Sequence, residues 1–288
     1  MNFNDFFYYG FKFVEKSIEI LPENSLINIL GNAGYLLDTK RKKVIFTNLN
    51  LAFPEKSKAQ KKKIAKKVYK NFARNLIEFV KNKKLSKKKL LEKVEFVGFE
   101  KLNYPVIFVT AHFGNWEILP IVFGSKFEKI NIVYRKLDNE KLNEEIIKSR
   151  KKFNVDVIEK KGALKKLISA LKRKETVGIL VDQNTAANEG IETTFFGKKV
   201  LQTPSAAILS KKFNTPIAMA FALPKEDKWQ IIIKDVFYTK DIQESVNRQS
   251  KVIEEMVRKY PDEYYWFHKK FKHFYEEEYK KLKVKNEK

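Results

Sequence analysis

The stretch that decides the fold is Val106-Ile-Phe-Val-Thr-Ala-His-Phe-Gly-Asn-Trp-Glu-Ile118. Its first six residues are nearly all apolar, which is typical of a short strand buried on both faces of a parallel sheet. Gly114 allows a tight turn after that strand, and Asn115 is a good N-cap for a following helix with Glu117 in its first turn. The stretch therefore predicts a strand, a turn and a helix, with His112 at the strand's carboxyl end, where open α/β sheets bind ligands.

Similar apolar runs continue along the chain and alternate with segments of helical spacing. We expect strands at 106–111, 130–134, 155–158, 177–181, 216–223 and 229–236, and helices at 139–151, 163–174, 204–213 and 243–259. The last two strands flank Lys225-Glu-Asp-Lys228, which resembles a hairpin connection. Alternating strands and helices predict an α/β fold with a mixed, mostly parallel central sheet flanked by helices.

The first part of the chain has helical periodicity only. Helices are expected at 3–20, 24–38, 40–51 and 57–81, which gives a helical N-terminal part (residues 1–95) continuous with an α/β core (96–288). Aromatic residues crowd the first helix, at Phe3, Phe6, Phe7, Tyr8, Tyr9, Phe11 and Phe13. This pattern fits a helix lying in a membrane interface, or equally a helix packed on the protein's own core. No apolar run reaches the 18 residues that would indicate a membrane span.

Composition narrows the classes of partner. The chain has 288 residues, 59 basic and 35 acidic, a formal net charge of +24 and no cysteine, which excludes disulfides, thiolate metal sites and cysteine nucleophiles. Residues 56–93 hold 16 basic and 2 acidic residues. Such charge favours an anionic membrane or an acidic protein, although a general lysine bias explains it equally well. No nucleic-acid recognition motif is present, so a nucleic-acid partner is not expected.

His112 and Glu117 are the candidate catalytic pair. A turn between them can fold the carboxylate onto one ring nitrogen, which leaves the other nitrogen free to take a proton from a hydroxyl. The alternative is a hydrogen-bonded core histidine beside an exposed glutamate. No serine, cysteine or lysine shows a nucleophile elbow, so direct attack on the acyl carbonyl is favoured over a covalent intermediate. The three histidines lack paired metal-ligand spacing, so no metal or other cofactor is expected.

The segment His112-Phe-Gly-Asn-Trp-Glu117 resembles the His-x-Gly-Asn-Trp-Glu block of the lipid A late acyltransferases, in the lysophospholipid acyltransferase-like superfamily. Further blocks resemble the same family in order along most of the chain: Asn48–Pro54, Tyr134–Asn139, Leu180–Gln183, Phe195–Gly197, Thr203–Pro204 and Tyr265–Lys272. The chain departs from the family pattern at Lys136, where proline is usual, and at Asn184, where a second acid is common. Its N-terminal anchor is also weaker than the family's membrane-spanning helix.

The resemblance implies a glycerolipid acyltransferase-like fold and a set of residue roles. His112 would be the general base and Glu117 its orienting carboxylate. Arg135 would stabilise an oxyanion or clamp a phosphate. Asp182 and Gln183 are expected to face the same cleft, and Asp182 would hold Arg135 or shape the site without being catalytic. Asn115 and Trp116 would shape the turn or touch substrate. Phe195 and Phe196 would line an acyl pocket or simply pack in the core.

The resemblance also implies a reaction and its setting. A fatty acyl chain would pass from an acyl carrier protein (or acyl-CoA) thioester to a hydroxyl of a lipid A precursor at the cytoplasmic face of the inner membrane. Lys81–Lys93 would be the docking surface for the acidic carrier or the anionic membrane. Two alternatives stay open at this point: an acyltransferase on a glycerophospholipid or other glycolipid, and a non-enzymatic basic protein that binds membranes or nucleic acid.

Overall fold

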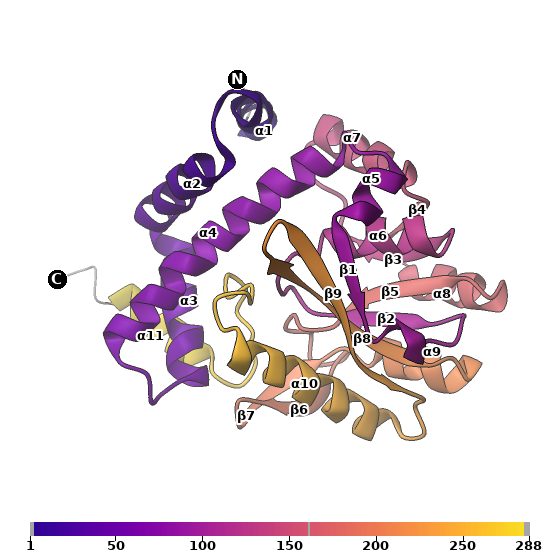
Figure 1. Cartoon of the computed structure of the whole chain (residues 1–288). Coiled ribbons are helices and arrows are strands. Elements are labelled where there is room, and N and C mark those ends of the chain that lie inside the picture. The colour runs from indigo at the N-terminus through magenta and orange to yellow at the C-terminus, as the bar shows by residue number, and fades with distance from the viewer. Residues whose placement is uncertain (1–2, 161, 285–288) are drawn as a thin grey trace.

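The centre of the molecule is a sheet of seven strands (Figure 1). The computed structural model describes residues 3–160 and 162–284, and the side chains of Phe3, Phe6 and Phe7 lie outside the described residues. The strands of the sheet, in spatial order, are β1 (Val94–Val97), β9 (Lys228–Phe237), β8 (Ile217–Lys225), β2 (Ile107–Thr110), β5 (Thr176–Leu180), β3 (Ile130–Tyr134) and β4 (Val155–Glu159). Every neighbouring pair is parallel except β8 and β9. The predicted mixed, mostly parallel sheet is therefore confirmed, including the hairpin that joins Lys225 to Lys228.

Three strands were not predicted. One is β1, at the sheet's edge, and the others form a separate antiparallel hairpin of β6 (Ile191–Phe195) and β7 (Lys198–Gln202). Of the six predicted strands, only 130–134 has the observed ends, and the other five differ by one or two residues at an end, which is the usual spread between assignments.

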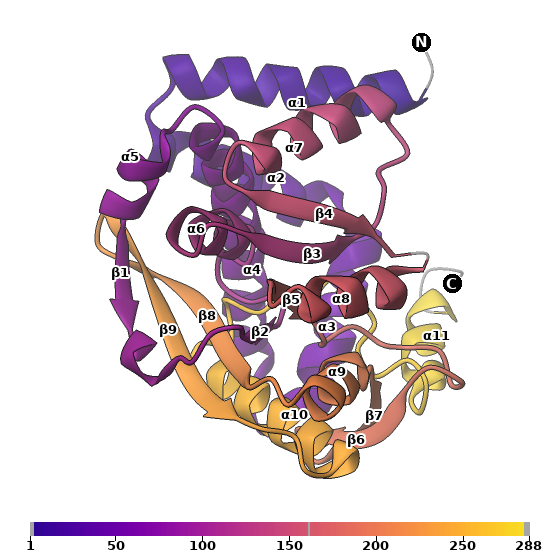
Figure 2. The same cartoon turned by 90° about the vertical axis from the view of Figure 1, so that its right-hand side faces the viewer.

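Helices cover both faces of the sheet (Figure 2). The N-terminal helices are α1 (Phe3–Ile20), α2 (Glu23–Leu37), α3 (Thr39–Ala52), α4 (Lys58–Asn82) and α5 (Lys87–Glu92). The others are the short 3-10 helix η1 (Phe99–Lys101), α6 (Ile118–Lys126), α7 (Glu140–Lys151), α8 (Ala163–Lys172), α9 (Ser205–Phe213), α10 (Ile242–Lys259) and α11 (Glu276–Val284). The helix α4 begins at a capping box, in which Ser57 and Gln60 satisfy each other's backbone N–H groups.

The two faces of β2 separate two hydrophobic clusters. Ile107 and Val109 face one cluster, whereas Phe108 faces the other, because successive strand residues point to opposite sides. The first cluster includes Leu49 of α3 and Val68 of α4, so these N-terminal helices share a core with one face of the sheet. The second cluster is built around α6 and includes Phe123.

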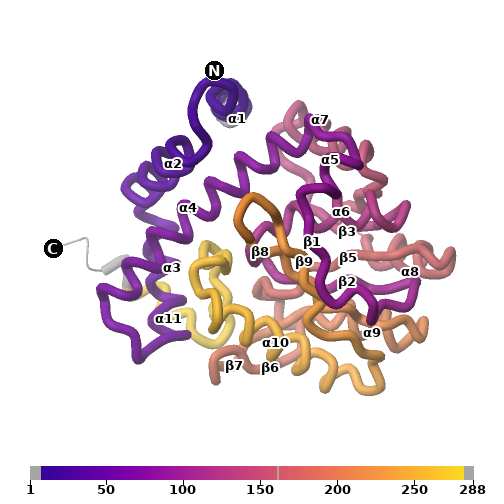
Figure 3. The backbone as a smooth tube through the Cα atoms, viewed as in Figure 1, coloured from indigo at the N-terminus to yellow at the C-terminus, as the bar shows by residue number. Residues whose placement is uncertain are grey.

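The two ends of the chain pack against other elements. On α1, Lys12 donates to Glu145 of α7 over 2.6 Å, and Figure 2 shows these two helices side by side. At the other end, α11 lies against α3 (Figure 3), where Tyr279 hydrogen-bonds Asn48. None of the helices in the described part of the chain combines the length and the low charge needed to cross a bilayer.

Candidate active site

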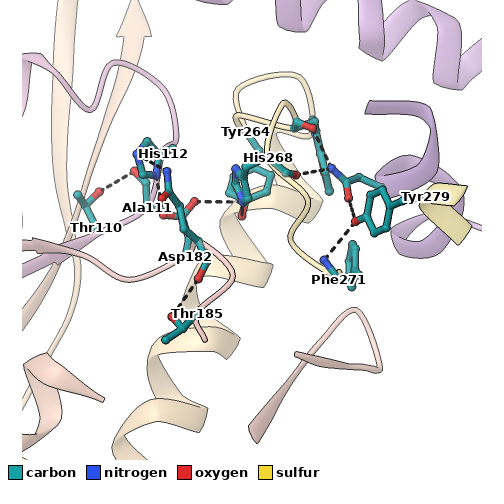
Figure 4. A network of polar contacts seen from close by, with 12 residues as sticks. Thr110, Ala111, His112, Asp182, Thr185, Tyr264, His268, Phe271 and Tyr279 are labelled. Carbon is teal, nitrogen blue, oxygen red and sulfur yellow. Dashed lines mark hydrogen bonds and ion pairs between the residues drawn. The ribbon is translucent and has the colours of Figure 1, made fainter. Parts of the chain in front are cut away.

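The ends of β2 and β5 bring a histidine and an aspartate together. These strands are parallel neighbours with Thr110 opposite Leu180, so two residues further along each strand lie level with one another. Those residues are His112 and Asp182, and His112 Nδ1 lies 2.8 Å from Asp182 Oδ1. Figure 4 shows Asp182 between the two imidazoles of His112 and His268. The two side chains, both expected at the site, are thus brought together by a direct hydrogen bond.

Backbone contacts fix the turn that carries His112. Gly114 has a φ of 56°, in the left-handed region, and a Cβ atom there would lie 1.7 Å from the carbonyl oxygen of Ala222. The N–H of Gly114 donates to Glu263 O (2.9 Å), and the N–H of Tyr265 donates to His112 O (2.8 Å). The turn is therefore held between β8 and the segment 260–272, and only glycine fits at position 114.

The charge of Asp182 fixes which ring nitrogen of His112 carries the proton. Asp182 is buried to 1% exposure. Burial alone would raise its pKa, but the charge of His112 and the hydrogen bond from it hold the pKa well below the usual range. An ionised carboxylate only accepts hydrogen bonds, so His112 Nδ1 must donate and Nε2 of the neutral ring keeps its lone pair. The Gln183 side-chain amide lies 3.3 Å from that Nε2, and Gln183 is exposed.

The same interaction tunes the proton affinity of His112. Burial by itself lowers the pKa of the ring, whereas the charge and hydrogen bond of Asp182, followed by the charge of Glu117, raise it. The net direction is upward from the ordinary value of 6.5. A histidine with an accepting nitrogen at the exposed side and a buried carboxylate behind it is the arrangement of a general base.

The prediction that Glu117 folds back onto the imidazole is wrong. Glu117 occupies the N-cap position of α6, one residue before the helix, and its Oε2 accepts from Arg150 of α7 over 2.7 Å. Its other oxygen accepts from the indole N–H of Trp116 over 3.2 Å. Because Glu117 is turned toward α7 at the start of α6, it acts on His112 only through its charge. Asp182 provides the hydrogen bond to His112.

Asn115, Trp116 and Arg135 have distinct surroundings. Asn115 is buried and its Oδ1 accepts from the backbone N–H of Ile118, which starts α6. The Trp116 ring lies 5.4 Å from the His112 ring. Arg135 follows β3 and is exposed, and within the described residues it forms no ion pair with Asp182. The suggestion that Asp182 holds Arg135 is therefore wrong, because Asp182 faces His112.

Phe195 and Phe196 are buried in the first hydrophobic cluster. Their rings contact Tyr264, Phe53 and one another. Of the two expectations for this pair, core packing is the one that their burial supports.

Sequence reasoning missed a second group of residues behind Asp182. Tyr264 and Lys270 are buried and His268 largely so, and all three lie on the segment that follows α10. The Tyr264 hydroxyl is 3.2 Å from His268 Nε2, which is 3.9 Å from Asp182 Oδ2. Burial, with further contributions from His112 and Lys270, lowers the pKa of His268 to about 4. The available signal was the block Tyr265–Lys272, in which a histidine stands between three aromatic residues and two lysines.

The expected docking segment Lys81–Lys93 is partly neutralised by the protein itself. Lys81 pairs with Glu23, Lys83 with Glu15, and Lys84 with Glu19. These acids lie on α1 and at the start of α2, so the pairs fasten the first two helices to the end of α4. Lys88 and Lys89 of α5 are exposed.

Among the described residues, no group of three or more histidines, cysteines and acids could hold a metal ion.

Comparison with known proteins places the whole chain in a family. Residues 3–273 match the model of the bacterial lipid A biosynthesis acyltransferases. The chain belongs to this family. The enzyme class expected from the sequence, an acyltransferase, is thereby confirmed.

Individual relatives of this acyltransferase are distant in sequence. It is 23% identical over 255 residues to the lipid A biosynthesis lauroyltransferase of Escherichia coli, which covers 84% of this chain and 83% of the relative. It is 22% identical over 244 residues to the lipid A biosynthesis palmitoleoyltransferase of the same organism, covering 81% and 79%. A solved 1-acyl-sn-glycerophosphate acyltransferase from Thermotoga maritima aligns with a TM-score of 0.38 and 14% identity, over 82% of this chain and 95% of that one.

Proposed function

We propose that this acyltransferase moves a fatty acyl chain from the thioester of an acyl carrier protein to a hydroxyl of a lipid A precursor. His112 is the general base in this proposal. The observation that carries it is the hydrogen bond between His112 Nδ1 and the buried Asp182, which leaves Nε2 as a proton acceptor beside the exposed Gln183. The names of the relatives support the acceptor class.

We infer the steps of the reaction from this arrangement. The acceptor hydroxyl takes the place of the Gln183 amide beside His112 Nε2 and gives up its proton as its oxygen attacks the thioester carbonyl. The tetrahedral intermediate collapses, the carbon–sulfur bond breaks, and the imidazolium returns the proton to the leaving thiolate. Asp182 stabilises the imidazolium between these steps, because the hydrogen bond to Nδ1 becomes an ion pair when the ring is charged. No covalent acyl-enzyme is needed.

Two cationic side chains support the proposal in different ways. Arg150 holds Glu117, whose charge helps to raise the pKa of His112. Arg135 is exposed at the end of β3, at the same sheet edge as the ends of β2 and β5. We assign Arg135 to a phosphate of the acceptor or to the developing oxyanion, because its guanidinium offers paired donors to either group.

A chain of aromatic rings connects the N-terminal helices with the base. Tyr35 of α2 contacts Tyr69 of α4, which contacts Phe267. Phe267 contacts Tyr265, and the Tyr265 ring lies 5.8 Å from the ring of His112. Tyr69 and Phe267 are buried in the first hydrophobic cluster, so this chain of rings holds α2 and α4 against the segment that carries Tyr265.

The same end of the molecule exposes apolar side chains that suit a membrane surface. Among the side chains that the structure describes on α1, α2 and their connection, the exposed large apolar ones are Tyr9, Phe13, Ile20, Leu21, Ile29, Leu36 and Leu37. Leu37 is 81% exposed and Phe13 is 72% exposed. Helices with such a face bind in the interface region of a bilayer, and nearby lysines strengthen binding to anionic lipids. We place these helices on the cytoplasmic face of the inner membrane, with exposed lysines of α5 available to the acidic carrier.

An acceptor panel tests the reaction. Purified protein is given an acyl carrier protein thioester or an acyl-CoA, and either a lipid A precursor or a 1-acyl-glycerophosphate, and the products are analysed by mass spectrometry. The proposal expects transfer from the carrier thioester to the lipid A precursor. Transfer only to the glycerophosphate would contradict the acceptor, and equal or faster use of acyl-CoA would contradict the donor.

Variants of two histidines test the base in the same assay. His112→Ala should lower the rate by about 10²–10⁴-fold, the usual contribution of a general base. The matched control is His273→Ala, since His273 is exposed. A non-enzymatic basic protein would show no transfer in any variant, and its lipid binding would survive both changes.

Vesicle sedimentation tests the membrane surface. Phe13→Ser with Leu37→Ser should weaken binding to phosphatidylcholine vesicles that contain phosphatidylglycerol, because both exposed side chains would enter the interface. Ile208→Ser on α9 is the control, since Ile208 is exposed but lies away from the N-terminal helices. Equal binding by the double variant and the control would contradict this placement.

A further inference from the structure

A lysine is buried behind the His112–Asp182 pair. The Lys270 side chain is 1% exposed, and its Nζ has no hydrogen-bond partner among the residues that the structure describes. The ring face of Phe195 lies beside it, with the ring centre 5.4 Å from Nζ. A buried ammonium is costly unless another charge compensates it. Lysine at this position therefore requires a reason beyond packing.

Asp182 is the carboxylate whose charge acts on this lysine. Lys270 follows His268 by two residues, and His268 Nε2 lies 3.9 Å from Asp182 Oδ2. Asp182 Oδ1 is bonded to His112, whereas its Oδ2 is buried without a hydrogen-bond partner in the described chain. Burial lowers the pKa of Lys270 to about 8, and the carboxylate of Asp182 opposes that lowering. His268, on the same side, has a pKa of about 4 and is neutral at pH 7. Before His112 takes up a proton, Lys270 is thus the cation among the three groups that act on Asp182.

We propose that Lys270 is a positioning residue for the transfer reaction. It is the buried counter-charge that keeps Asp182 ionised and limits how strongly Asp182 draws a proton onto His112. This inference rests on the proposed role of His112 as a general base. Lys270 itself does not touch the substrate.

Charge balance explains why such a counter-charge matters. With Lys270 protonated, Asp182 ionised and His112 neutral, the buried group is neutral overall. Without the ammonium, the same group carries one uncompensated negative charge, which proton uptake by His112 would neutralise. His112 would then hold its proton too firmly, both as a base that must start unprotonated and as an acid that must return the proton to the leaving thiolate.

The test compares a neutral and a charged replacement of Lys270. Lys270→Met removes the charge, Lys270→Arg keeps it, and Lys272→Met removes an exposed lysine as the control. The pKa of His112 is measured by NMR titration of its ring, and the acid limb of kcat/KM is measured in parallel. We expect both to move to higher pH in Lys270→Met and to stay in place in the other two proteins. At a pH below the limb, kcat/KM falls about tenfold when the pKa of His112 rises by one.

Other titratable groups around the pair must be followed in the same experiment. Asp182, His268, Tyr264 and Glu117 act on this group, and Tyr279 acts on Tyr264. Removing the Asp182 charge isolates the contribution of Lys270. In an Asp182→Asn background, the change Lys270→Met should no longer raise the pKa of His112, because the two charges act through one another.

The outcomes separate this inference from the proposed function. An unchanged pKa of His112 in Lys270→Met overturns the role of Lys270, as does an equal change in Lys270→Arg. If Lys270→Met does not fold, the double variant with Asp182→Asn should fold, since no lone buried charge is left, and failure of both would assign Lys270 to packing. The NMR titration does not depend on substrate, so the absence of transfer to a lipid A precursor would refute the proposed function alone.

Discussion

Replacing Asp182 with asparagine removes the charge behind His112 while keeping the shape of the side chain. The change turns a buried charge-assisted hydrogen bond of 2.8 Å into a neutral one. A hydrogen bond to a charged group contributes about 1.5–3 kcal/mol, which corresponds to roughly 10–150-fold in rate if it is lost only in the transition state. An amide can also donate to Nδ1, which places the ring proton on Nε2 and removes the base. We therefore expect kcat to fall by about 10²–10⁴-fold.

The pH profile of the same variant has a definite sign. In the wild-type protein, the charge and hydrogen bond of Asp182 raise the pKa of His112 against burial, which lowers it. Without that charge, the lowering effect of burial dominates and the pKa of His112 falls. The acid limb of the residual activity should therefore move to lower pH. The assay is kcat and kcat/KM for transfer from the carrier thioester between pH 5 and 9. Activity within threefold of wild type, or an acid limb moved to higher pH, would refute the reasoning.

Three further predictions concern the surroundings of the base. In the wild-type protein, kcat/KM should fall as the pH decreases through a pKa above 6.5, because only neutral His112 accepts a proton; a rate that stays constant down to pH 5.5 would contradict this. Glu117→Gln should lower the free energy of unfolding, measured in urea, by about 1–3 kcal/mol, because it leaves the guanidinium of Arg150 without its carboxylate. The control is Glu140→Gln, at an exposed position of α7. Equal stability of the two variants would refute the pairing. Gly114→Ala should cost about 1–2 kcal/mol in backbone strain, plus the cost of displacing Ala222, so it should lower both Tm and kcat. The control Gly162→Ala has a similar φ but open space around it, so it should lower Tm only by the strain.

Much of the fold could be predicted because the central strands β2, β5 and β8 are largely buried on both faces. Runs such as Val106–Ala111 have no other good location in a folded domain, and the helices between them follow from their spacing. The strand β1 was not predicted because Val94-Glu-Phe-Val97 is short and lies at the sheet's edge, where one side of the strand is left unpaired. The hairpin of β6 and β7 was not predicted because polar residues interrupt its apolar ones. The hairpin packs against α10 and does not join the main sheet.

The site was predicted in part, and the error has a structural cause. His112 was identified because it ends a buried strand before a glycine turn. Its partner was misassigned because Glu117 is close in the sequence, whereas Asp182 is close in the sheet. The order of strands makes β5 the neighbour of β2 although β3 and β4 come between them in the chain. Sequence spacing alone does not contain that order.

Lys270 shows a second limit of sequence reasoning. The chain has 59 basic residues, and nothing in the local sequence separates this lysine from the exposed Lys269 and Lys272 beside it. Its burial is a consequence of how the segment 260–272 folds over the end of β2. The charge on this residue becomes informative only when the lysine and Asp182 are both found buried in the same region.

The central claim, that His112 presents an unprotonated Nε2 because Asp182 holds the proton on Nδ1, can be measured directly. NMR of protein labelled with ¹⁵N in its three histidines, assigned with His268→Gln and His273→Gln, reports the tautomer and the pKa of His112. We predict the Nδ1–H tautomer at pH 8 and a pKa above 6.5 that falls in Asp182→Asn. A ring protonated on Nε2 at pH 8, or a pKa that Asp182→Asn leaves unchanged, would contradict the claim.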